Sequence, residues 1–197
     1  HYNDTHIGIL DIPLLANIPN LTYLAPANKE EYISMLDWSI DQQDVPVAIR
    51  VPWTGVTHAD YDVPKEYNKV SYKIVEEGED ICIIALGGFF ELGLKTAKMF
   101  KEKTGITPTL INPRFITGID KETLDWVQQK HNKVITIEDG ILNGGFGSKV
   151  AQYYSTKDIK VYNFGFSMDI PKVFDPIELM QRNFLSDYQI VDQVMSN

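Results

Sequence analysis

The sequence has a single cysteine and few basic residues, and each shortage excludes a class of protein. With Cys82 as the only cysteine, no disulfide can form within the chain. The apolar run around it, DICIIALGG, predicts a buried strand residue rather than a nucleophile. This cysteine usage fits a reducing compartment, and we expect a cytoplasmic protein. Eighteen Lys and Arg against 27 Asp and Glu leave a net charge of −9, which argues against nucleic acid or an anionic membrane surface as a partner.

Long hydrophobic runs are also absent. No stretch approaches the roughly 18 apolar residues of a membrane span, and the start, HYNDTHIG, has neither the basic nor the apolar part of a secretion signal. The chain lacks an initiator Met and opens on polar residues before an apolar run, so we expect it to begin inside a larger protein. Proteolytic removal of the original N-terminus would explain the missing Met equally well. A length of 197 residues is consistent with one large α/β domain or with a small domain plus part of another.

The first 52 residues predict a strand, a helix and a second strand. NLTYLAP at 20–26 and PVAIRVP at 46–52 have the pattern of buried strands, and NKEEYISMLDWSIDQQ at 28–43 that of a helix. Asn28 is placed to cap this helix, with Glu31 reaching back in a capping box. The helix carries an apolar stripe at helical spacing, formed by Ile33, Leu36 and Ile40. Together these elements predict one β-α-β unit with a right-handed connection.

Residues 53–69 lose all periodicity and collect Gly, Pro, Asp and Asn, which indicates a linker. We therefore predict a boundary near residue 68, with a partial β-α-β unit at 1–68 and a second domain at 69–197. In the second domain strands alternate with helices, which predicts a mostly parallel, doubly wound α/β sheet covered on both faces. The expected elements are strands at 71–78, 80–88, 107–112, 133–139 and 159–166, helices at 90–105, from Asp120 and up to about Tyr154, a short helix after Asp175, and a last helix that begins at Ser186.

A glycine-rich turn follows the strand in IEDGILNGGFGSKV, residues 137–150. Neither the Walker loop nor the dinucleotide fingerprint is complete there, since Gly145 is followed by Phe146 instead of a lysine. Glu138 and Asp139 also place two carboxylates where a polyanion would sit, and they can themselves supply the negative charge that a helix N-terminus favours. We expect a packed turn, with both carboxylates facing a neighbour or solvent.

The residues alone name no reaction. No HExxH, CxxC, nucleophile elbow or pair of histidine ligands occurs. A lone histidine, such as His6 in DTHIG, is more often a structural residue than a catalyst.

The order of motifs nevertheless resembles one family. T-H-x-G, then DIPLL, IPNL, a strand ending in AP, an acidic helix and PVAIR-P resemble the later half of the pyrimidine-binding domain of the 1-deoxy-D-xylulose-5-phosphate synthases. Beyond the linker, LINPRFITGID, VITIEDGILNGGFGSKV and VYNFGF resemble the transketolase C-terminal domain. These synthases are transketolase-like, thiamine diphosphate-dependent transferases, and the resemblance spans nearly the whole chain.

The resemblance implies the C-terminal part of an enzyme that joins pyruvate and glyceraldehyde 3-phosphate, with loss of CO₂, for isoprenoid and thiamine biosynthesis. The full-length enzyme would use thiamine diphosphate and Mg²⁺. Neither the family's G-D-G motif nor its activating glutamate is in this chain, so we expect no cofactor or metal bound to it and no activity by itself. A half-domain with open strand edges would be mobile or covered by another copy, and a homodimer is expected. The alternatives are a transketolase half, the β subunit of a 2-oxo acid dehydrogenase, or a non-catalytic dimerisation module.

The resemblance also assigns residues. His6 matches the active-site histidine, which is suited to proton transfer or to hydrogen-bonding an oxyanion. Asp4 lies near a substrate-contacting acid, and Arg50 is the first arginine of the family's R-x-P-R-G, so both are expected to bind substrate, although Arg50 could equally be a structural strand-end residue. Trp53 stands where the second arginine binds the substrate phosphate, and an indole cannot make that contact. Either another cation takes that role or the acceptor differs.

Overall fold

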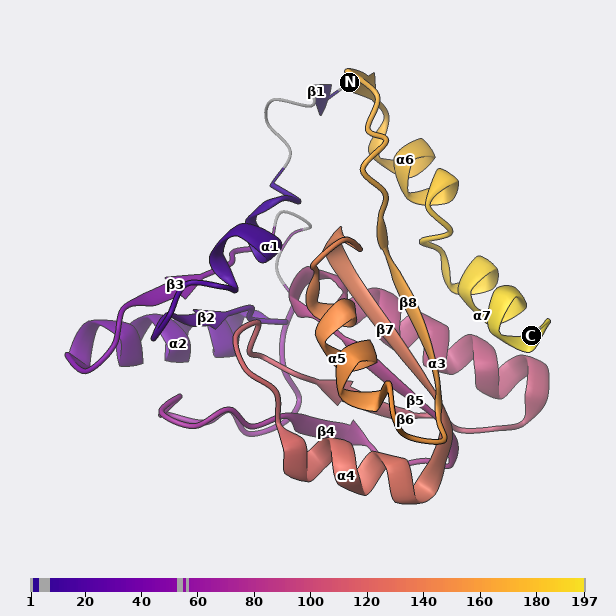
Figure 1. Ribbon diagram of the computed structural model, residues 1–197, viewed down its shortest axis with the longest axis horizontal. Coiled ribbons are helices and arrows are strands. Elements are labelled where there is room, and N and C mark those ends of the chain that lie inside the picture. Colours follow the sequence, from indigo (N-terminus) through magenta and orange to yellow (C-terminus); the bar gives the residue numbers. More distant parts are fainter. Residues whose placement is uncertain (1, 4–7, 53–54, 56, 197) are drawn as a thin grey trace.

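The computed structural model describes residues 2–3, 8–52, 55 and 57–196. This described part has α/β architecture, with one five-stranded sheet and two sheets of two strands (Figure 1). The five-stranded sheet has the order β4-β6-β5-β7-β8, and only the edge strand β4 runs antiparallel to its neighbour. Its strands are β4 (Lys73–Glu76), β5 (Asp80–Ala85), β6 (Thr109–Asn112), β7 (His131–Ile141) and β8 (Lys160–Phe166). The predicted fold class, a mostly parallel sheet in an α/β protein, is confirmed.

Helices cover both faces of this sheet (Figure 1). Along β5 the side chains alternate between the two faces: Ile83 packs with α3 (Phe90–Thr104) and α7 (Asp187–Met195), whereas Cys82 packs with α4 (Lys121–Lys130) and α5 (Phe146–Tyr154). Both residues are fully buried, as a strand covered on two sides requires. The expectation that Cys82 is a core residue is therefore confirmed.

Local sequence signals fix several of the helix ends. The Asp120 side chain accepts the Thr123 N–H at 3.1 Å and caps α4, and Ser186 caps α7 in the same way. α3 ends at Gly105, whose φ of 79° lies in the left-handed region that favours glycine. These starts and stops agree with the predicted ones.

The N-terminal segment, residues 8–52, adds α1 (Asp11–Leu15), β2 (Thr22–Leu24), α2 (Lys29–Asp41) and β3 (Val47–Ile49). β2 and β3 pair in parallel, which confirms the predicted strand-helix-strand order. The three apolar residues whose spacing predicted this helix are exposed: Ile33, Leu36 and Ile40. The helix instead buries the face that carries Glu31, Met35 and Trp38.

The rotation of α2 follows from where its first turn is bound. Asn28 accepts the Glu31 N–H at 2.9 Å, as predicted. The carboxylate of Glu31 does not reach back to Asn28, because it accepts the Ala27 N–H at 3.0 Å and pairs with Arg114. This inward contact holds the Glu31 face of the helix against the protein, so the expected capping box is only half formed.

One edge of β2 is closed by residues 114–117, which follow β6. The Ala25 N–H donates to the Arg114 carbonyl and the Ile116 N–H donates to the Tyr23 carbonyl, both at 2.7 Å. These residues form an isolated antiparallel bridge with β2, on the side opposite β3. The expectation of open strand edges, mobile or covered by another copy, is therefore wrong for β2, because the same chain covers it.

The start of the sequence pairs with a strand that precedes the last two helices. β1 (Tyr2–Asn3) pairs antiparallel with β9 (Val173–Phe174), just before α6 (Pro176–Arg182) (Figure 1). In the part of the chain that the structure describes, no helix is long and apolar enough to cross a membrane. The domain boundary near residue 68 stays a prediction.

Candidate functional site

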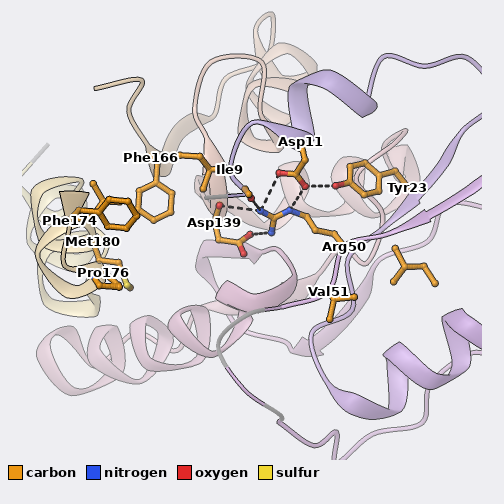
Figure 2. Close-up of a pocket in the computed structure, with 13 residues that line it drawn as sticks. Ile9, Asp11, Tyr23, Arg50, Val51, Asp139, Phe166, Phe174, Pro176 and Met180 are labelled. Atoms are coloured by element: carbon orange, nitrogen blue, oxygen red, sulfur yellow. Dashed lines mark hydrogen bonds and ion pairs between the residues drawn. The ribbon is translucent and has the colours of Figure 1, made fainter. Parts of the chain in front are cut away.

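A cavity of about 440 Å³ opens where the carboxyl ends of β3, β7 and β8 meet α6. This edge of a parallel sheet is where α/β proteins usually place their sites. Figure 2 shows two different walls: a polar one built around Arg50 and an apolar one opposite. The apolar wall consists of Ile9, Phe166, Phe174, Pro176, Leu179 and Met180.

Arg50 is the centre of the polar wall. Its Nε donates to Asp11 Oδ2 at 2.7 Å, its Nη1 forms an ion pair with Asp139, and its Nη2 donates to the Gly8 carbonyl at 2.6 Å. The arginine side chain is only 10% exposed. One guanidinium thus joins the start of α1, the end of β3 and the end of β7 (Figure 2).

The fold brings these groups together from distant parts of the sequence. Arg50 directly follows β3, and its N–H continues the ladder to the Leu24 carbonyl at 2.8 Å. Asp11 is the first residue of α1, and Asp139 lies near the end of β7. Tyr23, on β2, donates its hydroxyl to Asp11. The N-terminal segment and the five-stranded sheet therefore share one charged cluster.

The charges of this cluster set its electrostatics. Burial acts to lower the pKa of the Arg50 guanidinium, but Asp139 and Asp11 outweigh it and raise that pKa, so Arg50 stays charged. Burial also raises the pKa of the Tyr23 hydroxyl, as does its bond to Asp11. With both carboxyl groups ionised, the cluster carries one net negative charge, which disfavours an anion beside it.

The glycine-rich turn serves the protein's own carboxylate. Glu138 is fully buried and accepts the N–H groups of Phe146 and Gly147, both at 2.8 Å, at the start of α5. Burial raises the pKa of Glu138 to about 7, and the two N–H groups partly oppose that shift. A Cβ at Gly145 would overlap the Ile141 carbonyl oxygen and lie 2.5 Å from Glu138. Only glycine allows this close approach.

This geometry corrects one prediction and confirms another. Glu138 and Asp139 do not face a neighbour or solvent, because they are 0% and 3% exposed. The polar groups of β7 and the helix N-terminus satisfy each other inside the protein. The packed turn itself is confirmed, and the two oxygens of Glu138 supply the acceptors for the helix N-terminus.

A second buried ion pair lies on the other side of β2. Arg114 Nε donates to Glu31 Oε1 at 2.7 Å, and Asn112 Nδ2 donates to Glu31 Oε2 at 2.9 Å. Glu31 is 0% exposed, and the Arg114 side chain is 6% exposed. Arg114 Nη2 is buried with no hydrogen-bond partner among the described residues. This pair, like that of Arg50, ties the N-terminal segment to the five-stranded sheet.

Of the site residues that the resemblance assigned, the structure describes one. His6 and Asp4 lie outside the described residues, as does Trp53. Arg50 does line the cavity, but its substrate-binding role stays a prediction. Among the described residues, no group of three or more His, Cys, Asp or Glu is arranged to hold a metal ion.

Sequence reasoning missed Asp11 and Tyr23 and placed Asp139 on the surface. The available signal was Asp11 itself, a charged residue inside the apolar stretch GILDIPLL. Asp139 gave a similar signal, because it ends a buried apolar strand where an unpaired charge is costly. Only the fold shows that both acids meet Arg50.

Comparisons with known proteins agree with this architecture. A family model described as the transketolase C-terminal domain matches residues 71–190. The 1-deoxy-D-xylulose-5-phosphate synthase of Clostridium beijerinckii is 33% identical over 195 residues, which cover 98% of this chain and 31% of that protein. The synthase of Clostridium perfringens strain 13 is 39% identical over 154 residues, 76% of this chain and 24% of that protein. This chain thus spans about a third or less of these curated relatives.

Two solved structures share the fold. One, described as "Split gene transketolase, inactive beta4 tetramer", has a TM-score of 0.77 and 24% identity, covering 94% of this chain and 60% of that one. A transketolase mutant from Pichia stipitis has a TM-score of 0.73 and 13% identity, covering 98% of this chain and 27% of that one. At these identities the likeness concerns the fold alone.

Proposed function

This chain belongs to the transketolase C-terminal domain family, and from that membership we propose that it forms the C-terminal part of a thiamine diphosphate-dependent transferase of the 1-deoxy-D-xylulose-5-phosphate synthase type. One observation carries the proposal: similarity to a curated synthase runs at 33% identity over 98% of the chain. The similarity therefore includes the N-terminal segment as well as the five-stranded sheet.

The proposed reaction joins a two-carbon unit from pyruvate to glyceraldehyde 3-phosphate and releases CO₂, in a pathway that supplies isoprenoid and thiamine synthesis. Thiamine diphosphate, when bound, supplies the carbanion chemistry. Within the proposal, His6 transfers protons or hydrogen-bonds an oxyanion, and Asp4 contacts substrate. The chain's described residues contribute a rigid edge that anchors the segment following His6.

The described residues do not fit the Mg²⁺-diphosphate end of the cofactor. The cavity's polar wall sets two carboxylates against one guanidinium, an arrangement that repels a polyanion. The proposed enzyme would therefore hold its diphosphate and Mg²⁺ on another part, and this chain alone would be inactive. We further propose a cytoplasmic homodimer, in keeping with the enzyme family; the solved split transketolase is described as a tetramer of one kind of chain.

Two classes of alternative function would share this fold. A transketolase half or a 2-oxo acid dehydrogenase β subunit would share this fold, but relatives of 33% to 39% identity named as synthases favour the synthase. A non-catalytic dimerisation module would also keep the fold and would lack any need for His6.

A chimera tests the proposal directly. This chain replaces the matching C-terminal region of the Clostridium beijerinckii synthase, and CO₂ release from pyruvate is measured with glyceraldehyde 3-phosphate as acceptor. We expect turnover, and a loss of at least about 100-fold in His6→Ala, since general acid-base groups contribute roughly that factor. A folded, dimeric chimera without turnover would reject the synthase assignment. Turnover only with sugar phosphates would favour a transketolase half.

A further inference from the structure

Arg50 is a cation on a cavity wall, but its donors are already engaged by the protein. In addition to its bonds with Asp11 and the Gly8 carbonyl, its Nη2 lies 3.3 Å from the Asp139 carbonyl and its Nη1 pairs with the Asp139 carboxylate. All three of its nitrogens therefore donate to groups of this chain. A phosphate at this guanidinium would have to share it with the carboxylates of Asp11 and Asp139, which repel an anion.

Two of the groups that Arg50 binds, the Gly8 carbonyl and Asp11, belong to the start of the described N-terminal segment. Gly8 lies two residues after His6 in the sequence. The carbonyl of the next residue, Ile9, accepts the Ile141 N–H at 3.1 Å, so the ends of β3 and β7 both anchor residues 8–11. This short stretch precedes α1, and its position depends on these polar ties.

We propose that Arg50 is a positioning residue, which clamps residues 8–11 between the ends of β3 and β7, and that it does not bind a substrate phosphate. For catalysis this inference rests on the proposed function, because it concerns the segment that follows His6. The clamp itself depends only on the contacts of Arg50, Asp11 and Asp139.

The contacts show why arginine is needed. A guanidinium is a planar fork that reaches several acceptors at fixed angles, whereas a lysine ammonium is a single point charge. The Tyr23 hydroxyl donates to Asp11 Oδ2, the same oxygen that accepts from Arg50 Nε, so the carboxylate is not free to follow a displaced cation. Arg50→Lys should therefore keep the charge and lose the clamp.

Amide hydrogen exchange on the 197-residue chain tests the clamp without any assay of activity. In Arg50→Lys, a peptide covering residues 8–21 should exchange about tenfold faster, because losing a hydrogen bond between charged groups shifts local opening by roughly that factor. Asp139→Asn should give a similar increase, and the double variant should add little to either. A peptide covering β5 reports whether each variant is folded. Arg182→Lys, an exposed arginine on α6, is the matched control and should change nothing.

Steady-state kinetics of the chimera separate positioning from phosphate binding. With a positioning role, Arg50→Lys should lower kcat by the same factor for glyceraldehyde 3-phosphate and for unphosphorylated glyceraldehyde, with each KM within about twofold of wild type. A phosphate-binding residue would instead raise KM for the phosphorylated acceptor alone.

The outcomes are distinct. The proposal is overturned if residues 8–21 exchange at the wild-type rate in both single variants, or if inorganic phosphate binds the wild-type chain and not Arg50→Lys. It is also overturned if the kinetic loss is confined to the phosphorylated acceptor. A wild-type chimera without turnover counts against the proposed function only, and the exchange measurements then decide the role of Arg50.

Discussion

Replacing Glu31 by glutamine should remove a large share of the protein's stability. The glutamine side chain is nearly the same size, and its carbonyl oxygen can still accept from Arg114 Nε, which lies 2.7 Å from Glu31 Oε1 in the structure. Its amide nitrogen would then take the place of Glu31 Oε2, which now accepts from the Ala27 N–H and the Asn112 amide, both at about 3 Å. The new NH₂ group, a donor, would therefore face two other donors.

The larger effect is electrostatic. The variant leaves the Arg114 guanidinium buried without its carboxylate, and Nη2 of that arginine already lacks a partner among the described residues. Breaking a buried ion pair from one side typically costs about 3–5 kcal/mol. The free energy of unfolding of native proteins is typically only about 5–15 kcal/mol, so this loss is severe. Replacing both partners by apolar residues, Glu31→Leu with Arg114→Met, should recover part of it, because the desolvation of both charges disappears while the Ala27 N–H and the Asn112 amide lose their acceptor.

Urea unfolding followed by tryptophan fluorescence measures the effect. Trp38 on α2 and Trp126 on α4 report the two regions that the ion pair joins, and single-tryptophan versions separate their signals. Glu91→Gln is the matched control, because that carboxylate is 51% exposed and pairs with Lys95 on the helix surface; it should cost no more than about 0.5 kcal/mol. The reasoning fails if Glu31→Gln costs less than about 1 kcal/mol, or if the double apolar variant is no more stable than the single one.

The core of the five-stranded sheet offers three more tests. Gly145→Ala should destabilise the fold by about 1–3 kcal/mol or more in thermal melts, because its Cβ would overlap the Ile141 carbonyl oxygen; a neutral result would contradict the tight turn, and Gly8→Ala, with open space around it, is the control. The buried Glu138 has its pKa raised from 4.5 to about 7, so the folded state binds more protons than the unfolded one between these values. The free energy of unfolding should therefore fall as pH rises through this window, and Glu138→Gln should flatten the slope; a wild type indifferent to pH would contradict this. Burial raises the pKa of the Cys82 thiol, so iodoacetamide should modify it only under unfolding conditions, and rapid labelling of the native protein would refute its burial.

Local signals in the sequence predicted the elements well, and distant partners were beyond their reach. The caps at Asn28 and Asp120 and the stop at Gly105 could be predicted because each involves residues within a few positions. Glu31 lies in a pattern that predicts a capping box, but its true partner is 83 residues away. No periodicity within α2 contains that information.

The apolar stripe on α2 predicted the helix correctly, but it could not predict which face of the helix is buried. A helix pattern shows which residues share a face but not which face the rest of the chain covers. Prediction of the candidate site has the same limit. The family resemblance pointed to Arg50, but only the fold, which brings three segments together, shows that Asp11 and Asp139 are its partners. Asp139 was expected to face a neighbour or solvent, but its position at the end of a buried strand places it beside Arg50.

The antiparallel bridge that residues 114–117 make with β2 constrains how this protein can move. Its main-chain hydrogen bonds run from one side of the predicted linker to the other, so a hinge at residues 57–68 could move only after these bonds break. A protease that cuts this linker should therefore yield two fragments that stay associated and melt together.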